Sequence, residues 1–157
     1  MTAIILRPAV FDDWALLLDW VNQPDSLAWK SRTTDPIDAQ AHKTWLKRFL
    51  ENGESRIFVV LIADEPVGQI RFQADAECVF VIDVYVEANR RGDGVAQQAL
   101  AQGMAIVAKT RPSALFQAEV MARNTASRHL FQRLGFVETE RTANGVIYER
   151  TTKAGQT

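Results

Sequence analysis

The chain has 157 residues, the usual size of a single domain, and 47% of them are hydrophobic, which excludes a disordered or fibrous protein. The formal net charge of −1 gives no indication of a nucleic-acid partner. The single cysteine, Cys78, excludes an internal disulfide, and no group of Cys and His residues has the spacing of metal ligands. We therefore expect one domain over residues 1–157 that binds neither nucleic acid nor metal.

The N-terminal sequence MTAIILRPAV predicts a short strand at residues 3–9. It lacks the basic flank, the long apolar run and the cleavage site of a signal peptide. No other stretch approaches the roughly 20 consecutive apolar residues of a membrane span. We therefore expect a soluble, cytoplasmic protein that does not bind a membrane.

Two helices and three strands are expected next. Asp12 has the position of a helix N-cap, with Phe11 and Leu16 spaced as a hydrophobic staple. Residues 22–36 are rich in turn formers and predict a loop. The three strands form an antiparallel meander whose first turn is the sequence DEP. Periodicity places these elements as helices at 13–22 and 38–52 and strands at 56–64, 67–73 and 78–86.

The second half of the chain alternates helices with strands. A glycine-rich turn leads into an amphipathic helix that begins at Val95 and ends before Pro112. Asn124 is expected to cap the helix that follows the next strand, and Asn144–Gly145 to form the turn of the last hairpin. These later elements are a strand at 114–122, a helix at 124–134 and a hairpin at 135–151. The order of elements predicts an α+β fold with a central mixed sheet.

The glycine-rich turn lies in the sequence RRGDGVAQQAL, residues 90–100, with Gly92, Gly94 and Ala96 on alternate positions. Small residues at the start of a helix leave backbone N–H groups uncovered, and the helix dipole adds partial positive charge. Residues 87–157 carry 10 Lys and Arg against 6 Asp and Glu, a net charge of +4. The turn therefore predicts an anion site, and the alternative is an ordinary turn that needs a positive φ.

Two spaced motifs in this half resemble those of the GNAT superfamily of acetyl-CoA-dependent N-acetyltransferases. The pyrophosphate motif is matched by Arg91, Gly94 and Ala96, with Val86 at the hydrophobic position five residues before Arg91. The second motif is matched by Asn124, Ser127, Leu130, Phe131 and the sequence LGF at 134–136. The resemblance implies a three-layer α+β fold with a mixed, mostly antiparallel sheet flanked by helices, and an acetyltransferase domain spanning residues 1–157.

The same resemblance implies acetyl-CoA as the cosubstrate. Backbone N–H groups from Gly92 to Ala96 hold its pyrophosphate, Arg91 adds positive charge, and the backbone of the preceding strand aligns the pantetheine arm. The residues implied to bind acetyl-CoA are Val84, Val86, Arg91, Gly92, Asp93, Gly94, Val95, Ala96, Gln97, Asn124, Ser127 and Phe131.

The N-terminal half most resembles acetyltransferases of amino-sugar nucleotides, such as the pseudaminic acid pathway enzyme. This resemblance implies a small-molecule amine as the substrate and a contact set of Trp29, Arg32, His42 and Arg71. Similar openings occur in aminoglycoside and ribosomal-protein acetyltransferases, and a non-catalytic CoA-binding module is a third alternative. A histidine on an apolar helix face is also typical of a core residue, and a strand arginine of a structural ion pair. A monomer and a homodimer both stay open.

Two carboxylates are candidates for the catalytic base, Glu119 and Asp83. We favour Glu119 and expect Asp83 to contribute little, since Asp83 also fits a solvent-facing position on its strand and Glu119 fits a cross-strand ion pair. The tyrosine that serves as general acid in the family is Phe131 here, which cannot donate a proton. Water, Tyr85 or Tyr148 is then expected to protonate the leaving thiolate.

Overall fold

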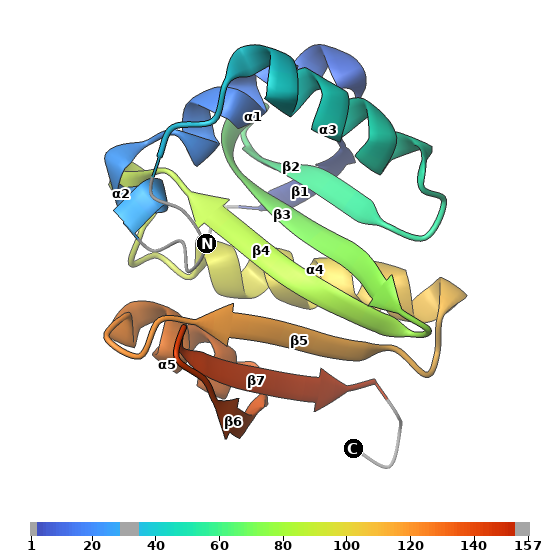
Figure 1. Cartoon of the computed structure of the whole chain (residues 1–157), viewed down its shortest axis with the longest axis vertical. Helices are drawn as coiled ribbons and strands as arrows, with labels where there is room; N and C mark the ends of the chain where they lie inside the picture. Colours follow the sequence, from blue (N-terminus) through green and yellow to red (C-terminus); the bar gives the residue numbers. More distant parts are fainter. Residues whose placement is uncertain (1–2, 29–34, 153–157) are drawn as a thin grey trace.

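The computed structural model describes residues 3–28 and 35–152. Seven strands form one open sheet in the order β1-β2-β3-β4-β5-β7-β6 (Figure 1). The only parallel neighbours within the described residues are β4 and β5. The strands are β1 (Ile4–Pro8), β2 (Arg56–Ile62), β3 (Glu65–Ala76), β4 (Val79–Val86), β5 (Leu115–Val120), β6 (Val137–Arg141) and β7 (Val146–Thr151). The expected α+β fold with a mixed, mostly antiparallel sheet is confirmed.

Helices cover both faces of this sheet. The helices are α1 (Trp14–Val21), α2 (Pro24–Ala28), α3 (Ala39–Glu51), α4 (Val95–Thr110) and α5 (Thr125–Arg133), with single 3₁₀ turns at Phe11–Asp13 and Ala88–Arg90. Side chains alternate along each strand, so β2 turns Phe58 and Val60 toward the core shared with α4, which runs behind the sheet in Figure 1. Ile57 and Val59 face the second core, which α1 and α3 complete.

The parallel strands β4 and β5 separate along their length. They pair only at Val79–Val81 with Leu115–Gln117, although β4 continues to Val86 and β5 to Val120. Beyond the last pair, the edges of β4 and β5 that face each other are unpaired, and an extended ligand could pair with them there. The divergence therefore places an opening in the middle of the sheet, next to the start of α4.

Three local predictions differ from the structure. The meander turns at Ala63–Asp64, both with positive φ, rather than at DEP, because two such residues match the twist of a tight hairpin. Asp13, not Asp12, makes the capping contact before α1: its carboxylate accepts the backbone N–H of Val10 at 2.8 Å. The expected loop at 22–36 contains the short helix α2, which begins with Pro24 where a missing N–H costs nothing.

Candidate active site

The glycine-rich turn has the open backbone that the sequence predicts. Gly92 and Gly94 have φ of +88° and +79°, and a Cβ built on either would meet nothing within 4 Å. Gly94 is the N-cap of α4 and adopts the left-handed conformation, which L-residues with a side chain rarely adopt. The N–H groups at the start of α4 therefore face open space, as an anion site at a helix N-terminus requires.

A cavity of about 550 Å³, here called the turn cavity, extends from this turn along the separated edges of β4 and β5 to the start of α5. All but one of the twelve residues predicted to bind acetyl-CoA line it. They are Val84, Val86, Arg91, Gly92, Gly94, Val95, Ala96, Gln97, Asn124, Ser127 and Phe131. The exception is Asp93, an exposed residue that does not line this cavity.

Several of these residues already have partners in the chain, among them Asn124 and Arg91. Asn124 caps α5, because its Oδ1 accepts the backbone N–H of Ser127 at 3.2 Å. Arg91 forms an ion pair of 2.7 Å with Asp25 of α2, and its Nε donates to the backbone carbonyl of Val86 at 2.7 Å. Arg91 thus joins α2 to the end of β4, and a bound phosphate would have to share its guanidinium with Asp25.

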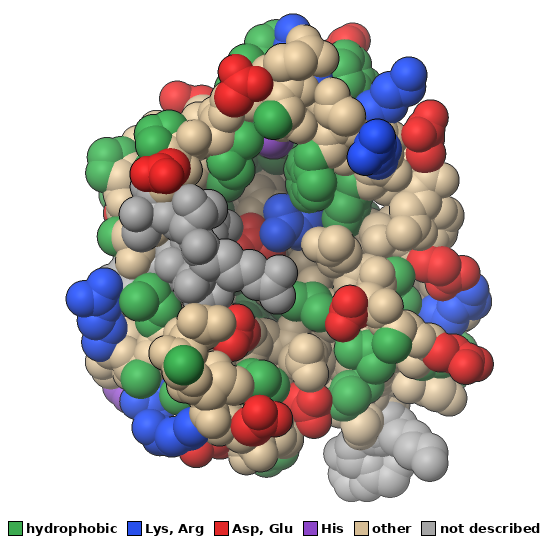
Figure 2. Space-filling model, in the orientation of Figure 1, with side chains coloured by type: hydrophobic (Ala, Val, Ile, Leu, Met, Phe, Trp, Pro, Cys, Tyr) green, Lys and Arg blue, Asp and Glu red, His purple; other side chains and the backbone are tan. Residues whose placement is uncertain are grey.

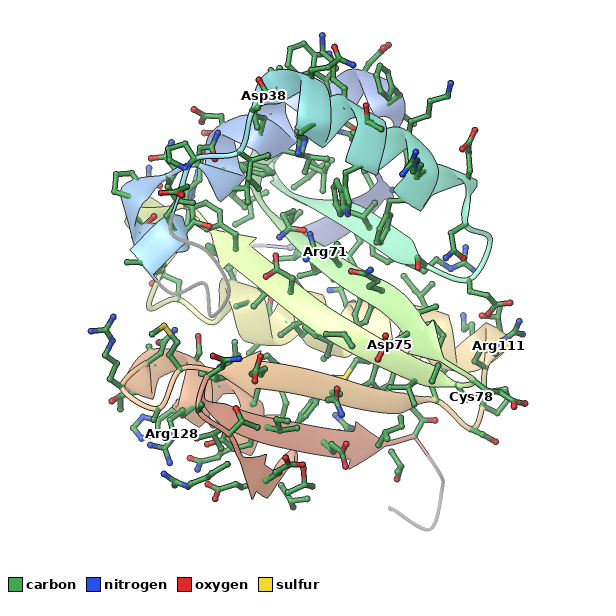
Figure 3. The ribbon with its side chains drawn as sticks, in the orientation of Figure 1. Asp38, Arg71, Asp75, Cys78, Arg111 and Arg128 are labelled. Carbon is green, nitrogen blue, oxygen red and sulfur yellow. The ribbon has the colours of Figure 1, made fainter. Side chains whose placement is uncertain are left out.

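A second cavity of about 400 Å³, the apolar cavity, lies between the sheet and helices α1 to α3. Most of its wall is aliphatic or aromatic, and the polar exceptions include His42, Gln69 and Arg71. The space-filling view shows a hollow on this face with a basic and an acidic side chain inside it (Figure 2). Arg71 projects from the middle of β3 on this face (Figure 3). Two of the four predicted acceptor contacts, His42 and Arg71, therefore share one cavity.

The apolar cavity contains three buried polar atoms without a hydrogen-bond partner within the described residues: His42 Nε2, Gln69 Oε1 and Arg71 Nε. His42 and Gln69 are only 4% and 7% exposed. Burial lowers the pKa of His42, and the charge of Arg71 lowers it further. A hydrogen bond with the backbone of Trp14 raises this pKa but does not outweigh them. Buried polar atoms rarely stay unpaired in folded proteins, so these three atoms indicate a place for a polar ligand.

Asp83 stands where the two cavities meet, since it lines both of them together with Ser26 and Tyr85. Its Oδ2 accepts a hydrogen bond of 2.9 Å from Gln69. Glu119 lines only the turn cavity, is exposed, and accepts a hydrogen bond of 3.1 Å from the Thr142 hydroxyl. The two candidate bases therefore differ in position, and Asp83 is the one that faces both ligand spaces.

The phenol groups also differ. Tyr148 is fully buried, accepts a hydrogen bond from Arg128 at 3.0 Å and lines neither cavity, so its expected role as a proton donor is wrong. Tyr85 lines both cavities and donates weakly to Asp25, at 3.4 Å. Burial raises the pKa of Tyr85, as do the nearby charges of Asp25 and Glu87, while Arg91 opposes them. Tyr85 is thus kept protonated.

Several site residues escaped the sequence analysis. Gln69 and Asp25 have no motif around them, and only the β3–β4 register and the fold of α2 bring them to the cavities. The predicted contacts Trp29 and Arg32 lie outside the described residues. Within the described chain, no group of three or more His, Cys, Asp and Glu side chains is placed to hold a metal ion, and no helix has the length and apolar character to cross a membrane.

Known proteins share this architecture. A family model described as an acetyltransferase (GNAT) domain matches residues 3–137. The N-acetyltransferase of Staphylococcus aureus Mu50 is similar with a TM-score of 0.83 and 22% identity, over 97% of this chain and 100% of that one. A ribosomal L7/L12 alpha-N-protein acetyltransferase in complex with coenzyme A is similar with a TM-score of 0.82 and 16% identity, over 98% of this chain and 97% of that one. The spermidine N-acetyltransferase of Vibrio cholerae, in complex with CoA and spermine, is similar with a TM-score of 0.83 and 13% identity, over 95% of both chains. No curated protein sequence matches.

Proposed function

Since the chain belongs to the GNAT family of acetyltransferases and is therefore an N-acetyltransferase that uses acetyl-CoA, we propose that it acetylates the primary amine of a small molecule bound in the apolar cavity. The observation that carries this proposal is the place of Asp83, which borders both the turn cavity and the apolar cavity. From that junction, one carboxylate could contact both a ligand in the turn cavity and a ligand in the apolar cavity. The amine to be acetylated and the acetyl group would meet there.

The glycine-rich turn fits the phosphate groups of acetyl-CoA, because its N–H groups are uncovered and the positive φ of Gly92 and Gly94 excludes most other residues. Arg91 would add a cation to the same end of the cavity. The unpaired edges of β4 and β5 fit an extended arm that binds like a further strand. Asn124 would contribute from the N-terminus of α5, which it caps at the wall of the turn cavity.

Acetyl-CoA supplies a thioester whose carbonyl carbon forms a bond with the amine nitrogen while the bond from carbon to sulfur breaks. The amine loses a proton and the thiolate gains one. We propose that Asp83 accepts the amine's proton, directly or through water, because it borders the acceptor space and Glu119 does not. Tyr85 is the proposed proton donor, since its raised pKa keeps the phenol protonated and its ring lines both cavities.

The acceptor itself has several candidates. The sequence resemblance favours an amino-sugar nucleotide, for which Arg71 could hold a phosphate. A protein α-amine, an aminoglycoside or a polyamine is an acceptor in relatives or structural neighbours. The walls of the apolar cavity are mostly aliphatic and aromatic and enclose about 400 Å³, near the lower end of the range for small-molecule sites. This size and lining favour a compact acceptor over an extended peptide.

The test is release of free thiol from acetyl-CoA in the presence of a panel of amines: amino acids, polyamines, aminoglycosides, amino-sugar nucleotides and an N-terminal peptide. We expect at least one small-molecule amine to be acetylated, with a new amide mass in the product. Titration calorimetry measures acetyl-CoA binding separately. Binding without turnover of any amine would support the alternative of a non-catalytic CoA-binding module.

The variant Gly94→Val tests the cofactor site. A β-branched residue is strained at a φ of +79° and covers the N–H groups at the start of α4, so acetyl-CoA affinity should fall at least tenfold. The matched control is Gly53→Val, because Gly53 has equally open surroundings and no positive φ. Undiminished binding by a folded Gly94→Val would overturn the placement of acetyl-CoA at this turn.

A further inference from the structure

Among the described residues, Arg71 is the one lysine or arginine that lines the apolar cavity. Its Cζ lies 5.0 Å from the centre of the Trp45 ring, so the flat guanidinium is held against an aromatic wall. Its Nε is buried without a partner, and the described part of the chain offers the guanidinium neither a hydrogen bond nor an ion pair of 4 Å or less. A half-buried cation in this state is open to an anion, and a fixed arginine fork fits a carboxylate with two parallel hydrogen bonds.

Other groups around Arg71 point to the same kind of ligand. His42, buried on α3, has an unpaired Nε2 in the same cavity, and Gln69, two residues before Arg71 on β3, has an unpaired Oε1. One faces the cavity from the helix layer and the other from the sheet. A ligand with both acceptor and donor atoms would satisfy all three unpaired atoms, whereas an apolar ligand would satisfy none.

The register of β3 and β4 orients such a ligand. Arg71 and Asp83 are directly opposite residues of this antiparallel pair, so a positive and a negative side chain stand next to each other on one face of the sheet. Asp83 borders the turn cavity and Arg71 does not. A molecule whose amine lies at Asp83 and whose carboxylate lies at Arg71 would present the amine to the acetyl group and turn the carboxylate away from it.

We propose, as an inference that rests on the proposed function, that the acceptor is a free α-amino acid with an apolar side chain and that Arg71 binds its carboxylate. An α-amino acid carries its amine and carboxylate on one carbon, which matches charges on directly opposite residues. The apolar side chain would pack among Leu17, Trp20, Leu27, Ile37, Trp45 and Ile57. A polyamine would place a second cation near Arg71, and a peptide N-terminus or an amino-sugar nucleotide has no carboxylate beside its amine.

The first test uses the wild-type protein and three matched amines: phenylalanine, phenylalaninamide and phenethylamine. They share the ring and the amine and differ in the carboxylate. With acetyl-CoA in excess, we expect kcat/KM for phenylalanine to exceed that for phenylalaninamide at least 30-fold. The same ratio is expected for leucine against leucinamide. If the amides or simple amines are acetylated as well as the acids, the carboxylate assignment fails while acetyl-transfer to small amines stands. If no amine in the wider panel is acetylated, the proposed function itself fails.

The second test uses Arg71→Gln, with Arg48→Gln as a control on the exposed face of α3. Arg71→Gln should raise KM for the amino acid at least 30-fold with little change in kcat, and leave acetyl-CoA affinity unchanged. In a thermal-shift assay with coenzyme A present, the amino acid should raise the Tm of the wild type and of Arg48→Gln but not of Arg71→Gln. An equal Tm shift in a folded Arg71→Gln would overturn the proposal. If this variant does not fold, the comparison of acid with amide in the wild type still tests it.

Discussion

Asp83 and Glu119 face different parts of the site, and this difference makes their roles separable. An amine as basic as a lysine side chain, with a pKa of about 10.4, costs about 4.6 kcal/mol to deprotonate at pH 7, and a less basic α-amine costs less. Asp83, at the junction of both cavities, is the proposed acceptor of that proton. Asp83→Asn should therefore lower kcat/KM by about 10²–10⁴ at neutral pH, and by less at high pH where the amine is already free.

Glu119→Gln is the paired variant, and it should lose no more than a few-fold, because Glu119 borders only the turn cavity. The measurement is the pH dependence of kcat/KM for both variants beside the wild type. Reversed losses would assign the base to Glu119, as the sequence alone favours. Losses of less than threefold in both would leave the positioning of the reactants as the main catalytic device.

The motif resemblance assigns Phe131 to the position of the tyrosine acid of the family. It is 3% exposed and packs against Phe136 and Tyr148, with ring centres 5.1 and 6.4 Å away. A thiol with a pKa of about 8.5 is only about 2 kcal/mol from its thiolate at pH 7, and Tyr85 is available as a donor. Phe131→Tyr should therefore keep kcat within about threefold, at a small loss of stability for its buried hydroxyl.

Steady-state kinetics on the natural acceptor measures this effect, with Tyr85→Phe as the comparison. If Tyr85 is the donor, Tyr85→Phe should lower kcat at least tenfold in the parent, and Phe131→Tyr should restore part of it in the double variant. A hundredfold gain from Phe131→Tyr alone would mean that the parent lacks an effective acid, and would favour the non-catalytic alternative.

Helix α4 lies close against the sheet because Gly103 has no side chain. A Cβ at this position would come within 2.6 Å of Ile70 Cδ1 and 2.7 Å of the Phe72 ring. An alanine in a helix normally gains about 1 kcal/mol over glycine, but overpacking a core costs about 1–3 kcal/mol. Two fully buried side chains would have to move here, so Gly103→Ala should lower the free energy of unfolding by up to about 2 kcal/mol.

Equilibrium urea unfolding measures this loss, and Ala105→Gly on the exposed face of α4 calibrates the helix-propensity contribution. The control should be destabilised by about 1 kcal/mol. A more stable Gly103→Ala would show that α4 can shift away from β3 without cost. Since Gly94 is the N-cap of α4, such a shift would also move the glycine-rich turn proposed to bind acetyl-CoA.

Local chemistry in the sequence predicts most of the elements. Asn124 caps α5 as its position indicates, and the β-branched run of β4 is a strand. The sequence does not predict where β4 and β5 stop pairing, because that depends on tertiary packing. Nor does it predict that Gln69, Arg71 and His42 leave polar atoms unpaired. Each residue type usually finds a partner, and only the assembled cavity shows that these atoms have none among the residues that the structure describes.

At the scale of the whole molecule, the sheet consists of two parts joined by few backbone contacts. One part is β1 to β4, and the other is β5, β7 and β6. Three residue pairs join them, at the start of β4 and β5, and contacts between α4 and α5 add to the connection. The turn cavity is lined by both parts. A ligand bound there would therefore stabilise the junction as well as the residues that it touches.

Acetyl-CoA should accordingly stabilise both parts together. At a concentration 100 times its Kd, a ligand that binds only the folded state adds about 2.7 kcal/mol, which for a domain of this size raises the Tm by about 5–10 °C. Hydrogen exchange should slow at residues 82–86 of β4 and also at 118–120 of β5, where the strands are not paired with each other. The coenzyme would then bridge the two parts of the sheet.

Differential scanning fluorimetry and hydrogen exchange with mass spectrometry measure the two effects, and Gly94→Val serves as the control that should show neither. Protection confined to the glycine-rich turn, with β5 unchanged, would mean that only the phosphate end of acetyl-CoA is bound firmly. Protection on β4 and β5 together would mean that the arm carrying the thioester lies between the separated strands. An arm in that position would point toward Asp83, because Asp83 and Tyr85 are the β4 residues that line both the turn cavity and the apolar cavity. The same experiment therefore tests whether the acetyl group reaches the space proposed for the acceptor.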